Sequence, residues 1–508
     1  MRTLGEREAT LGLNAGPTHA AGFNRRVLLA AAAGVAMAGP VAFGGRALAR
    51  QTMDNAVSGS STPSGRQMQL LMKALDDAPS HGFDRYEFAP ATLSDLVQSG
   101  DPSAWPQLNT AILAYARAQR GQRIPLSTFP AEWSIRPAAY DPAPELSAAI
   151  AVDGLGPWLD SLAPPYEGYQ GLRASLATYR QIAGNHGWKP VPEGAPLAAG
   201  AVDPRVGALR RRLAAEDPRT PAGDASDSFD APLTEAVIRF QKRYGLTPDG
   251  IVGPPTVAAM NAPVGQRILQ IKANMERWRW LPKTLPTSRV QVNIAAAVMA
   301  VYQNDQPVLA MKAVAGKPGD ETPMLGSVIQ SVVLNPPWHV PDSIAKKEIG
   351  PKSAHDHGYL ARNAFEVHRA DDGVLHYVQK AGPKSALGRF KFDFSNPFGV
   401  YLHDTPAQSG FAHASRLSSH GCVRLEHPKA LAELLLTGDE DFTPERIDEV
   451  VTTDKTIRAP LAHPIPVFIF YWTAFVDGAG RLQFRNDAYD WDRKLLGLIA
   501  ASKTQADA

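Results

Sequence analysis

The sequence predicts a multidomain α+β protein, helical in its first half and mainly β with flanking helices in its second half. Its 508 residues exceed the length that a single hydrophobic core usually serves, so several domains are expected. Before about residue 288 the apolar residues recur at helical spacing, whereas from Arg289 they alternate with a period of two. The 43 prolines and 42 glycines are dispersed, which indicates many loops rather than a disordered chain.

Composition narrows the possible partners. The chain is 44% hydrophobic and 20% charged, and its formal net charge is +2. This balance is that of an ordinary globular protein, without the basic excess that nucleic-acid binding would need. We therefore expect no nucleic-acid partner.

The first 49 residues are expected to form an export signal. A polar leader, Met1 to Arg26, precedes the apolar run Val27 to Phe43 and the small-residue site at Ala47 to Ala49. The segment from Arg25 to Leu29 resembles a twin-arginine signal, and Sec export stays open. An uncleaved membrane anchor is the alternative, although the 17-residue apolar run is short for a spanning helix. The mature chain is expected to begin near Arg50 and to work in the periplasm.

Three helical regions are expected after a Ser, Thr and Gly-rich tether at residues 50–66. Residues 67–200 should form a helical scaffold, because helical stretches alternate with proline-rich joints. Residues 201–263 should form a small bundle of three short helices, with a turn at Thr247 to Gly253. Residues 264–287 should form a connecting helix whose aromatic stripe serves packing.

A β-rich domain is expected at residues 288–475. Its strands are predicted at Val290 to Ile294, at Val298 to Tyr302 and Pro307 to Val314 as a hairpin, and at Val328 to Leu334, Val374 to Gln379 and Val467 to Trp472. A helix is expected at Pro428 to Leu436. A charged insert at about 342–385 is a candidate lid. Residues 476–508 are predicted to form a hairpin and a short helix without chemistry.

The single cysteine of the chain, Cys422, lies between Gly421 and Val423 in a loop rich in polar residues. A lone thiol in an exported chain is either incidental or reactive, and this setting favours a thiolate. Glycine before a nucleophile lets the backbone approach a substrate carbonyl. His403 ends a predicted strand, 15 residues before Ser419, and can meet a loop cysteine. The pattern predicts a cysteine nucleophile with a histidine base.

A zinc ligand and an inert buried thiol are the two other interpretations of the cysteine. Several histidines surround it, which could indicate zinc, but no second cysteine and no H-E-x-x-H motif is present. An inert buried thiol would need an apolar helical stripe, and the residues after Cys422 show none before Pro428. We therefore expect no metal and no organic cofactor.

The pattern of a histidine, fifteen residues and then S-H-G-C-x-R resembles the YkuD-type L,D-transpeptidase signature, with H-D-T where many relatives have H-G-T. The insert motifs N-P-x-W-x-V-P, G-Y-L-A-R-N and G-P-K-x-x-L-G resemble the large Gram-negative members of that family. Residues 203–260 resemble the three-helix peptidoglycan-binding domain, for which a role as a mere spacer is the alternative. The resemblance implies a mixed β-sandwich for the catalytic domain.

The resemblance also implies a role for each motif residue. Cys422 would be the nucleophile, His403 its base, and the main-chain carbonyl of Asp404 the group that orients the imidazole. Ser419, His420 and Gly421 would shape the loop and supply oxyanion N–H groups. Arg424 and Trp338 would contact the substrate, Arg424 by holding a carboxylate or the loop.

The implied reaction is acyl transfer in the cell wall. The donor would be a tetrapeptide stem of peptidoglycan that releases D-alanine, the acceptor a diaminopimelate amine of a neighbouring stem, and the product a 3–3 cross-link. Carbapenems would be inhibitors. Three alternatives stay open: a carboxypeptidase or endopeptidase that uses water, an enzyme that attaches outer-membrane proteins to the wall, and a non-catalytic wall-binding scaffold.

Overall fold

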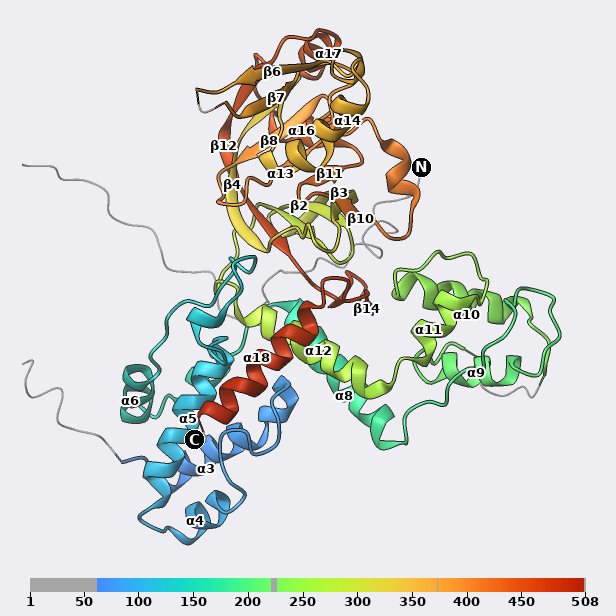
Figure 1. Ribbon diagram of the computed structural model, residues 1–508. Helices are drawn as coiled ribbons and strands as arrows, with labels where there is room; N and C mark the ends of the chain where they lie inside the picture. Colours follow the sequence, from blue (N-terminus) through green and yellow to red (C-terminus); the bar gives the residue numbers. More distant parts are fainter. Residues whose placement is uncertain (1–61, 221–225, 372, 507–508) are drawn as a thin grey trace, which may run out of the picture. The chain divides into compact units, whose positions relative to one another are not determined.

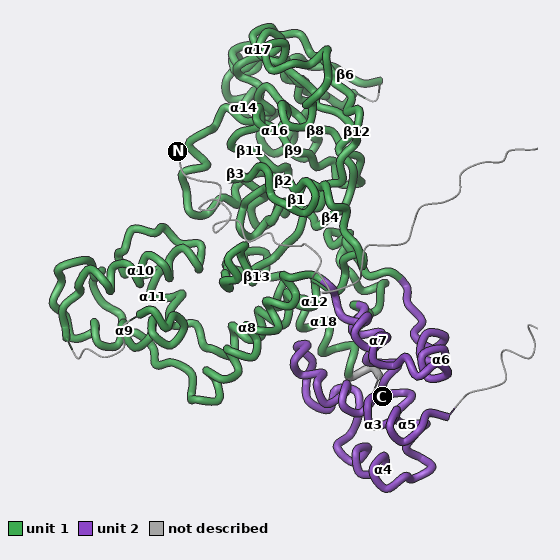
Figure 2. The backbone as a smooth tube through the Cα atoms, turned by 180° about the vertical axis from the view of Figure 1, so that it is seen from behind, with its two compact units in different colours: residues 1–16, 121–138, 166–508 green, residues 17–120, 139–165 purple. Residues whose placement is uncertain are grey.

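The computed structural model describes residues 62–220, 226–371 and 373–506 (Figure 1). The predicted export signal and residues 50–61 of the predicted tether lie outside these residues. The last two residues of the predicted tether, Gly65 and Arg66, belong to the first described helix. The described residues fall into two compact units (Figure 2): a helical unit of residues 62–120 and 139–165, and a sheet unit of residues 121–138, 166–220, 226–371 and 373–506. Over the described ranges, no helix is both long enough and apolar enough to cross a membrane.

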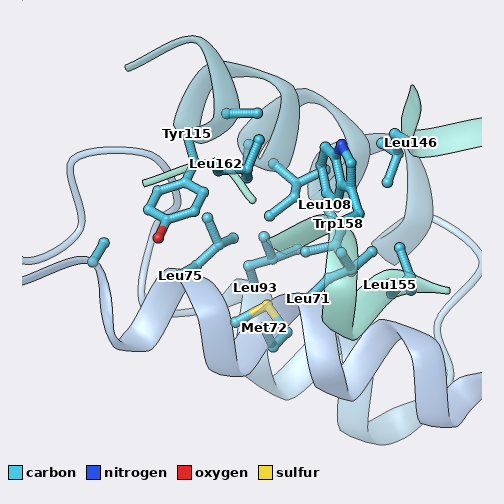
Figure 3. Packing of buried hydrophobic residues seen from close by; sticks show 14 of the residues in the cluster. Leu71, Met72, Leu75, Leu93, Leu108, Tyr115, Leu146, Leu155, Trp158 and Leu162 are labelled. Atoms are coloured by element: carbon cyan, nitrogen blue, oxygen red, sulfur yellow. The ribbon is translucent and has the colours of Figure 1, made fainter. Parts of the chain in front are cut away.

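The helical unit is built from short helices around one apolar core (Figure 3). Its helices are α3 (Gly65–Asp76), η1 (Ala78–His81), α4 (Leu93–Ser99), α5 (Ala104–Gln119), α6 (Ala143–Ala151) and α7 (Leu155–Asp160). Leu71 and Leu108 are fully buried where α3 packs on α5, and Trp158 of α7 joins them. Ser64 and Gln67 form a capping box that fixes the start of α3.

The sheet unit contributes its own helices before the strands begin. They are η2 (Leu126–Thr128), α8 (Glu167–Gly184), α9 (Val206–Ala214), α10 (Ala231–Arg243), α11 (Pro254–Asn261) and α12 (Val264–Arg279). Helices α9, α10 and α11 are the three short helices that the sequence predicts, and α12 is the connecting helix. Trp278 of α12 stacks on Trp472 at 4.5 Å, which shows that the aromatic stripe packs. Helix α8, which lies within the predicted scaffold of residues 67–200, belongs to the sheet unit. The domain boundaries given by the sequence stay predictions.

Nine strands form one mixed sheet in the order β10-β3-β11-β9-β8-β4-β12-β1-β2. Strand β2 also pairs with β3, so the sheet closes on itself. The strands are β1 (Arg289–Asn293), β2 (Val298–Gln303), β3 (Gln306–Gly316), β4 (Leu325–Leu334), β8 (Phe390–Phe394), β9 (Leu402–His403), β10 (Leu417–Ser419), β11 (Val423–Leu425) and β12 (Ile457–Phe470). Pairs β1–β12, β3–β10 and β9–β11 are parallel. The mixed sheet beside helical regions confirms the predicted fold class.

The predicted hairpin is present and its turn explains it. Asn304 and Asp305 join β2 to β3 with φ angles of 52° and 61°. Two successive residues at positive φ match the twist of a two-residue hairpin, and Asn and Asp tolerate that conformation. The short strands β8 and β11, which the sequence reasoning did not predict, complete the sheet beside β9.

The predicted insert folds around a small core of its own. A three-stranded sheet in the order β5-β7-β6 packs with short helical turns around Val340, Ala345, Ile349 and Tyr377. Its elements are β5 (Trp338–His339), α13 (Asp342–Ile344), the π-helical turn η3 (Ala345–Ile349), α14 (Gly350–His355), α15 (Tyr359–Arg362), β6 (Phe365–Arg369) and β7 (Leu375–Gln379). The insert is therefore a folded module rather than a loop.

The remaining elements follow the site and close the chain. They are η4 (Gln408–Ala412), α16 (Pro428–Leu435), α17 (Pro444–Thr452), β13 (Ala474–Val476), β14 (Leu482–Phe484) and α18 (Trp491–Ala506). Helix α16 and the tail hairpin β13–β14 match the sequence predictions.

Candidate active site

Three neighbouring strands bring a row of basic side chains to one face of the sheet. Lys391 of β8 and Arg424 of β11 are both cross-strand partners of His403 on β9. Directly paired residues share a face of the sheet. Their neighbours Leu402 and Val423 are fully buried on the opposite face. The alternation of each strand thus aims the polar row away from the core and toward the site.

Cys422 lies immediately before β11, in a loop that is closed by hydrogen bonds of its own. The hydroxyl of Ser419 donates to the carbonyl of Cys422 at 2.6 Å and accepts the N–H of Gly421 at 3.2 Å. Gly421 has a φ of +108°, which L residues rarely adopt. Ser419 is the last residue of β10, and Gly421 lies in the loop between β10 and β11. The N–H of Gly421, however, already donates a hydrogen bond to Ser419 within the loop.

A second set of hydrogen bonds holds this loop from behind. The hydroxyl of Thr322 donates to the carbonyl of Gly421 at 2.7 Å and accepts the N–H of Gly316 at 2.8 Å. The hydroxyl of Tyr489 donates to the carbonyl of Gly316 at 2.5 Å and accepts the N–H of Thr322 at 3.3 Å. Sequence reasoning assigned no role to Thr322 or to the tail, because neither carries a motif.

The imidazole of His403 is buried and oriented by main chain. Its Nδ1 lies 2.5 Å from the carbonyl oxygen of Asp404, which can only accept, so Nδ1 carries the proton and Nε2 is unprotonated in the neutral ring. The Asp404 carboxylate instead accepts the N–H groups of Arg389 and Thr405, both at 2.7 Å. The main-chain carbonyl of Asp404, and not its side chain, therefore contacts the imidazole.

Burial and charge keep this imidazole neutral. Burial, followed by the positive charge of Arg424, lowers the pKa of His403 to about 3. Protonation would place a cation in a desolvated position beside two others. At neutral pH His403 is therefore an unprotonated base.

The Cys422 thiol lies among groups that act on its pKa in opposite directions. Burial raises its pKa, although Tyr401, Lys391 and Arg424 act in the opposite direction. Burial thus favours the neutral thiol, whereas the polar loop taken alone indicates a thiolate. Among the described residues, no hydrogen bond joins His403 directly to Cys422. The proton must leave the sulfur as the substrate is attacked.

Tyr401 lies at the centre of the site and was missed as a functional residue. Its ring meets that of His403 edge-on at 5.6 Å, and Nζ of Lys391 lies 4.5 Å from its centroid. Burial, then the charge and hydrogen bond of Cys422, raise the pKa of Tyr401, whereas a hydrogen bond with Trp338 lowers it. The only sequence signal was its position two residues before His403 on the same strand face. Trp338 of β5 thus reaches the rim of the site through Tyr401.

Two cations, Arg424 and Lys391, flank His403 on the sheet and act on the charge of Cys422. The Nε atom of Arg424 is buried and has no hydrogen-bond partner among the described residues. Burial lowers the pKa of Arg424, and the charges of Cys422 and Glu348 raise it. Lys391 pairs with Asp393 at 2.8 Å. A carboxylate or a developing negative charge would be stabilised here.

His420 is the motif residue whose side chain turns toward the insert. Its Nε2 lies 2.6 Å from Oε1 of Glu348 on the turn η3. Sequence reasoning placed His420 in the loop and did not find Glu348. Within the described ranges, no group of three or more His, Cys, Asp and Glu side chains is arranged to hold a metal ion.

Comparisons with known proteins match three parts of the chain. Residues 287–451 match the family described as "L,D-transpeptidase catalytic domain" (YkuD), residues 202–260 a "Putative peptidoglycan binding domain" and residues 60–176 a "Scaffold domain". A "Putative L,D-transpeptidase" of Haemophilus influenzae is 29% identical over 241 residues, which are 44% of this chain and 48% of that protein. The chain thus spans about half the length of this curated relative.

Solved structures give weaker matches. The catalytic domain of an L,D-transpeptidase from E. faecium, acylated by ertapenem, is 14% identical, with a TM-score of 0.20 over 37% of this chain and 99% of that one. An L,D-transpeptidase from Mycobacterium smegmatis is 14% identical, with a TM-score of 0.20 over 36% of this chain and 58% of that one. From the family matches, the chain carries an L,D-transpeptidase catalytic domain of the YkuD family together with a peptidoglycan-binding domain and a scaffold domain.

Proposed function

We propose that this protein is a peptidoglycan L,D-transpeptidase that forms 3–3 cross-links through an acyl-enzyme on Cys422. The observation that carries the proposal is the arrangement of the cysteine loop beside a neutral, main-chain-oriented His403 within the matched catalytic domain. A nucleophile beside an unprotonated imidazole is suited to acyl transfer.

In the first half-reaction the sulfur of Cys422 attacks the carbonyl between the third stem residue and the terminal D-alanine. The thiol proton passes to Nε2 of His403 and then to the leaving amine of D-alanine, and a thioester remains. The positive Arg424 and Lys391 favour the developing negative charge. We assign the oxyanion contact to the N–H of Cys422, because that of Gly421 is bonded to Ser419.

In the second half-reaction the side-chain amine of a diaminopimelate residue attacks the thioester. An amide bond forms, the carbon–sulfur bond breaks, and the amine's proton returns to the sulfur by way of His403. Water competes for the thioester, so the site must exclude it until the amine arrives. We assign this task to the insert, whose turn η3 lies against the nucleophile loop at His420.

We further propose that the protein acts in the periplasm and that α9 to α11 bind peptidoglycan. Support comes from the match of residues 202–260 to a peptidoglycan-binding domain. Co-sedimentation of the inactive Cys422→Ala protein with isolated sacculi tests binding without turnover. Pelleting with sacculi supports the proposal, and a protein that stays in the supernatant reduces the bundle to a spacer.

The proposed reaction is tested by incubating purified protein with a defined disaccharide-tetrapeptide and identifying the products by mass spectrometry. A cross-linked dimer formed with release of D-alanine supports the transpeptidase. Tripeptide without dimer would make the protein a hydrolase. Unchanged tetrapeptide with retained sacculus binding would make it a scaffold. Reaction with protein lysines in place of the stem amine would make it an anchoring enzyme.

A further inference from the structure

The insert touches the nucleophile loop through one charged contact. The carboxylate of Glu348 lies 2.6 Å from Nε2 of His420, two residues before the cysteine. Both side chains are about one-third exposed, at 34% and 31%. The contact therefore lies at the surface where the insert meets the site.

Glu348 is held in place by the core of the insert. Its neighbour Ile349 and the first residue of the same turn, Ala345, are both buried in that core. Lys352, one turn later, lies 3.2 Å from the same carboxylate. Burial raises the pKa of Glu348, but Lys352 and His420 outweigh it and lower the pKa. At neutral pH the carboxylate is ionised and faces His420 and, more distantly, Arg424.

Other charged contacts of the described insert stay within it. Glu366 pairs with Lys380 at 2.8 Å, and Asp342 lies 3.8 Å from His376. At the base of the insert, Gln379 bonds the carbonyl of Lys384 and the N–H of Ala386. Gln379 thus ties the base of the insert, and Glu348 contacts the nucleophile loop. A folded module held to the site by such contacts is suited to act as a lid.

We propose that Glu348 determines the choice of acceptor by latching the insert onto the nucleophile loop through His420, so that the thioester meets an amine before it meets water. This inference rests on the proposed transpeptidase function. A polar contact between side chains that are one-third exposed contributes little to stability, so such a latch opens readily for the donor and the acceptor. A stronger, buried pair would keep the site shut.

The test compares Glu348→Gln with Glu366→Gln, a control that removes a paired carboxylate from the same insert away from the loop. The wild type and both variants react with iodoacetamide across a pH series. At high pH the thiol is fully ionised. The plateau rate of alkylation therefore depends on the access of iodoacetamide to the sulfur and not on the thiol pKa. We expect a rise of about threefold to fivefold for Glu348→Gln, as befits a weak, partly exposed contact, and no change for Glu366→Gln. Equal plateaus for all three proteins would overturn the latch.

Glu348→Asp keeps the negative charge but shortens the side chain, so that the carboxylate no longer extends to His420. It therefore distinguishes loss of the contact from loss of the charge. We expect its plateau rate to rise as for Glu348→Gln, and a wild-type rate would contradict the inference. With tetrapeptide substrate, both Glu348 variants should raise the ratio of tripeptide to dimer by a similar factor. A wild type that makes no dimer would refute the proposed function, while the alkylation rates still decide whether the latch exists. Far-UV circular dichroism confirms that each variant is folded.

Discussion

The hydroxyl of Tyr489 donates a hydrogen bond to the carbonyl of Gly316, 173 positions earlier in the chain, at 2.5 Å. The same hydroxyl accepts the N–H of Thr322, whose side chain holds the carbonyl of Gly421. A residue of the tail thus supports the backbone beside the nucleophile. Each of these groups is buried, so a lost partner cannot be replaced by bulk water.

Tyr489→Phe should therefore destabilise the protein by about 1–3 kcal/mol, because it leaves a buried carbonyl and N–H without this partner. Acylation of Cys422 should slow as the loop loses its support. Urea unfolding and carbapenem acylation rates measure the two effects. Tyr86→Phe, at an exposed position in the helical unit, serves as the control and should change neither. Wild-type acylation by Tyr489→Phe would show that the loop does not need this support.

Gly421→Ala should slow acylation on the order of tenfold. A methyl group at position 421 would meet its nearest neighbour, the carbonyl of Glu321, at 3.6 Å, so no clash arises. The cost is conformational, since a φ of +108° strains any L residue by about 1–2 kcal/mol. Gly410→Ala, with no atom closer than 3.9 Å, is the matched control. Stopped-flow acylation by a carbapenem compares them, and equal rates would contradict the role given to Gly421.

His403→Gln should make the protein less sensitive to acid. In the folded protein the pKa of His403 is about 3, below the ordinary value of 6.5, so the unfolded chain binds more protons between these values. Wild-type stability must then fall as the pH drops below 6.5. Between pH 7 and pH 4 this residue should account for about 3 kcal/mol of that loss. Urea unfolding at both pH values measures it, and equal losses in wild type and variant would refute the burial of a neutral imidazole.

Glu216→Gln should destabilise the protein by about 3–5 kcal/mol at pH 7, because it leaves buried Arg212 without its counter-charge. The two side chains lie 2.8 Å apart and are 1% and 0% exposed. Tyr179 and Tyr244 also donate to this carboxylate, at 2.5 and 2.6 Å. The exposed Glu235→Gln on α10 is the control.

The pH dependence gives a second check of Glu216. Burial raises its pKa, but the charges of Arg212 and Arg243 outweigh burial and lower the pKa to about 2. The stabilisation is therefore present above pH 4.5 and is lost as the pH falls toward 2. Thermal unfolding should show this loss in the wild type and not in Glu216→Gln. A variant as stable as the wild type at pH 7 would contradict the proposed network.

The sequence predicted those parts of the fold and site that depend on residues close together along the chain. The alternation before His403, the turn at Asn304 and Asp305, and the spacing to the S-H-G-C motif are all short-range patterns. The rest depends on strand pairing. Lys391 becomes a neighbour of His403 only through the register of β8 and β9, and Tyr489 reaches Gly316 only in the folded unit. The direction of the Cys422 pKa shift likewise depends on tertiary contacts, among them Tyr401, Lys391 and Arg424, which short-range patterns do not give.

The central claim is that Cys422 is the nucleophile, and intact-mass spectrometry after incubation with a carbapenem tests it most directly. The strained lactam resembles the acyl donor and should acylate the same sulfur. We expect one drug adduct on the wild type, located on the peptide that contains Cys422, and none on Cys422→Ala. A zinc chelator should not change the result. An adduct that survives Cys422→Ala, or one lost on chelation, would contradict the account.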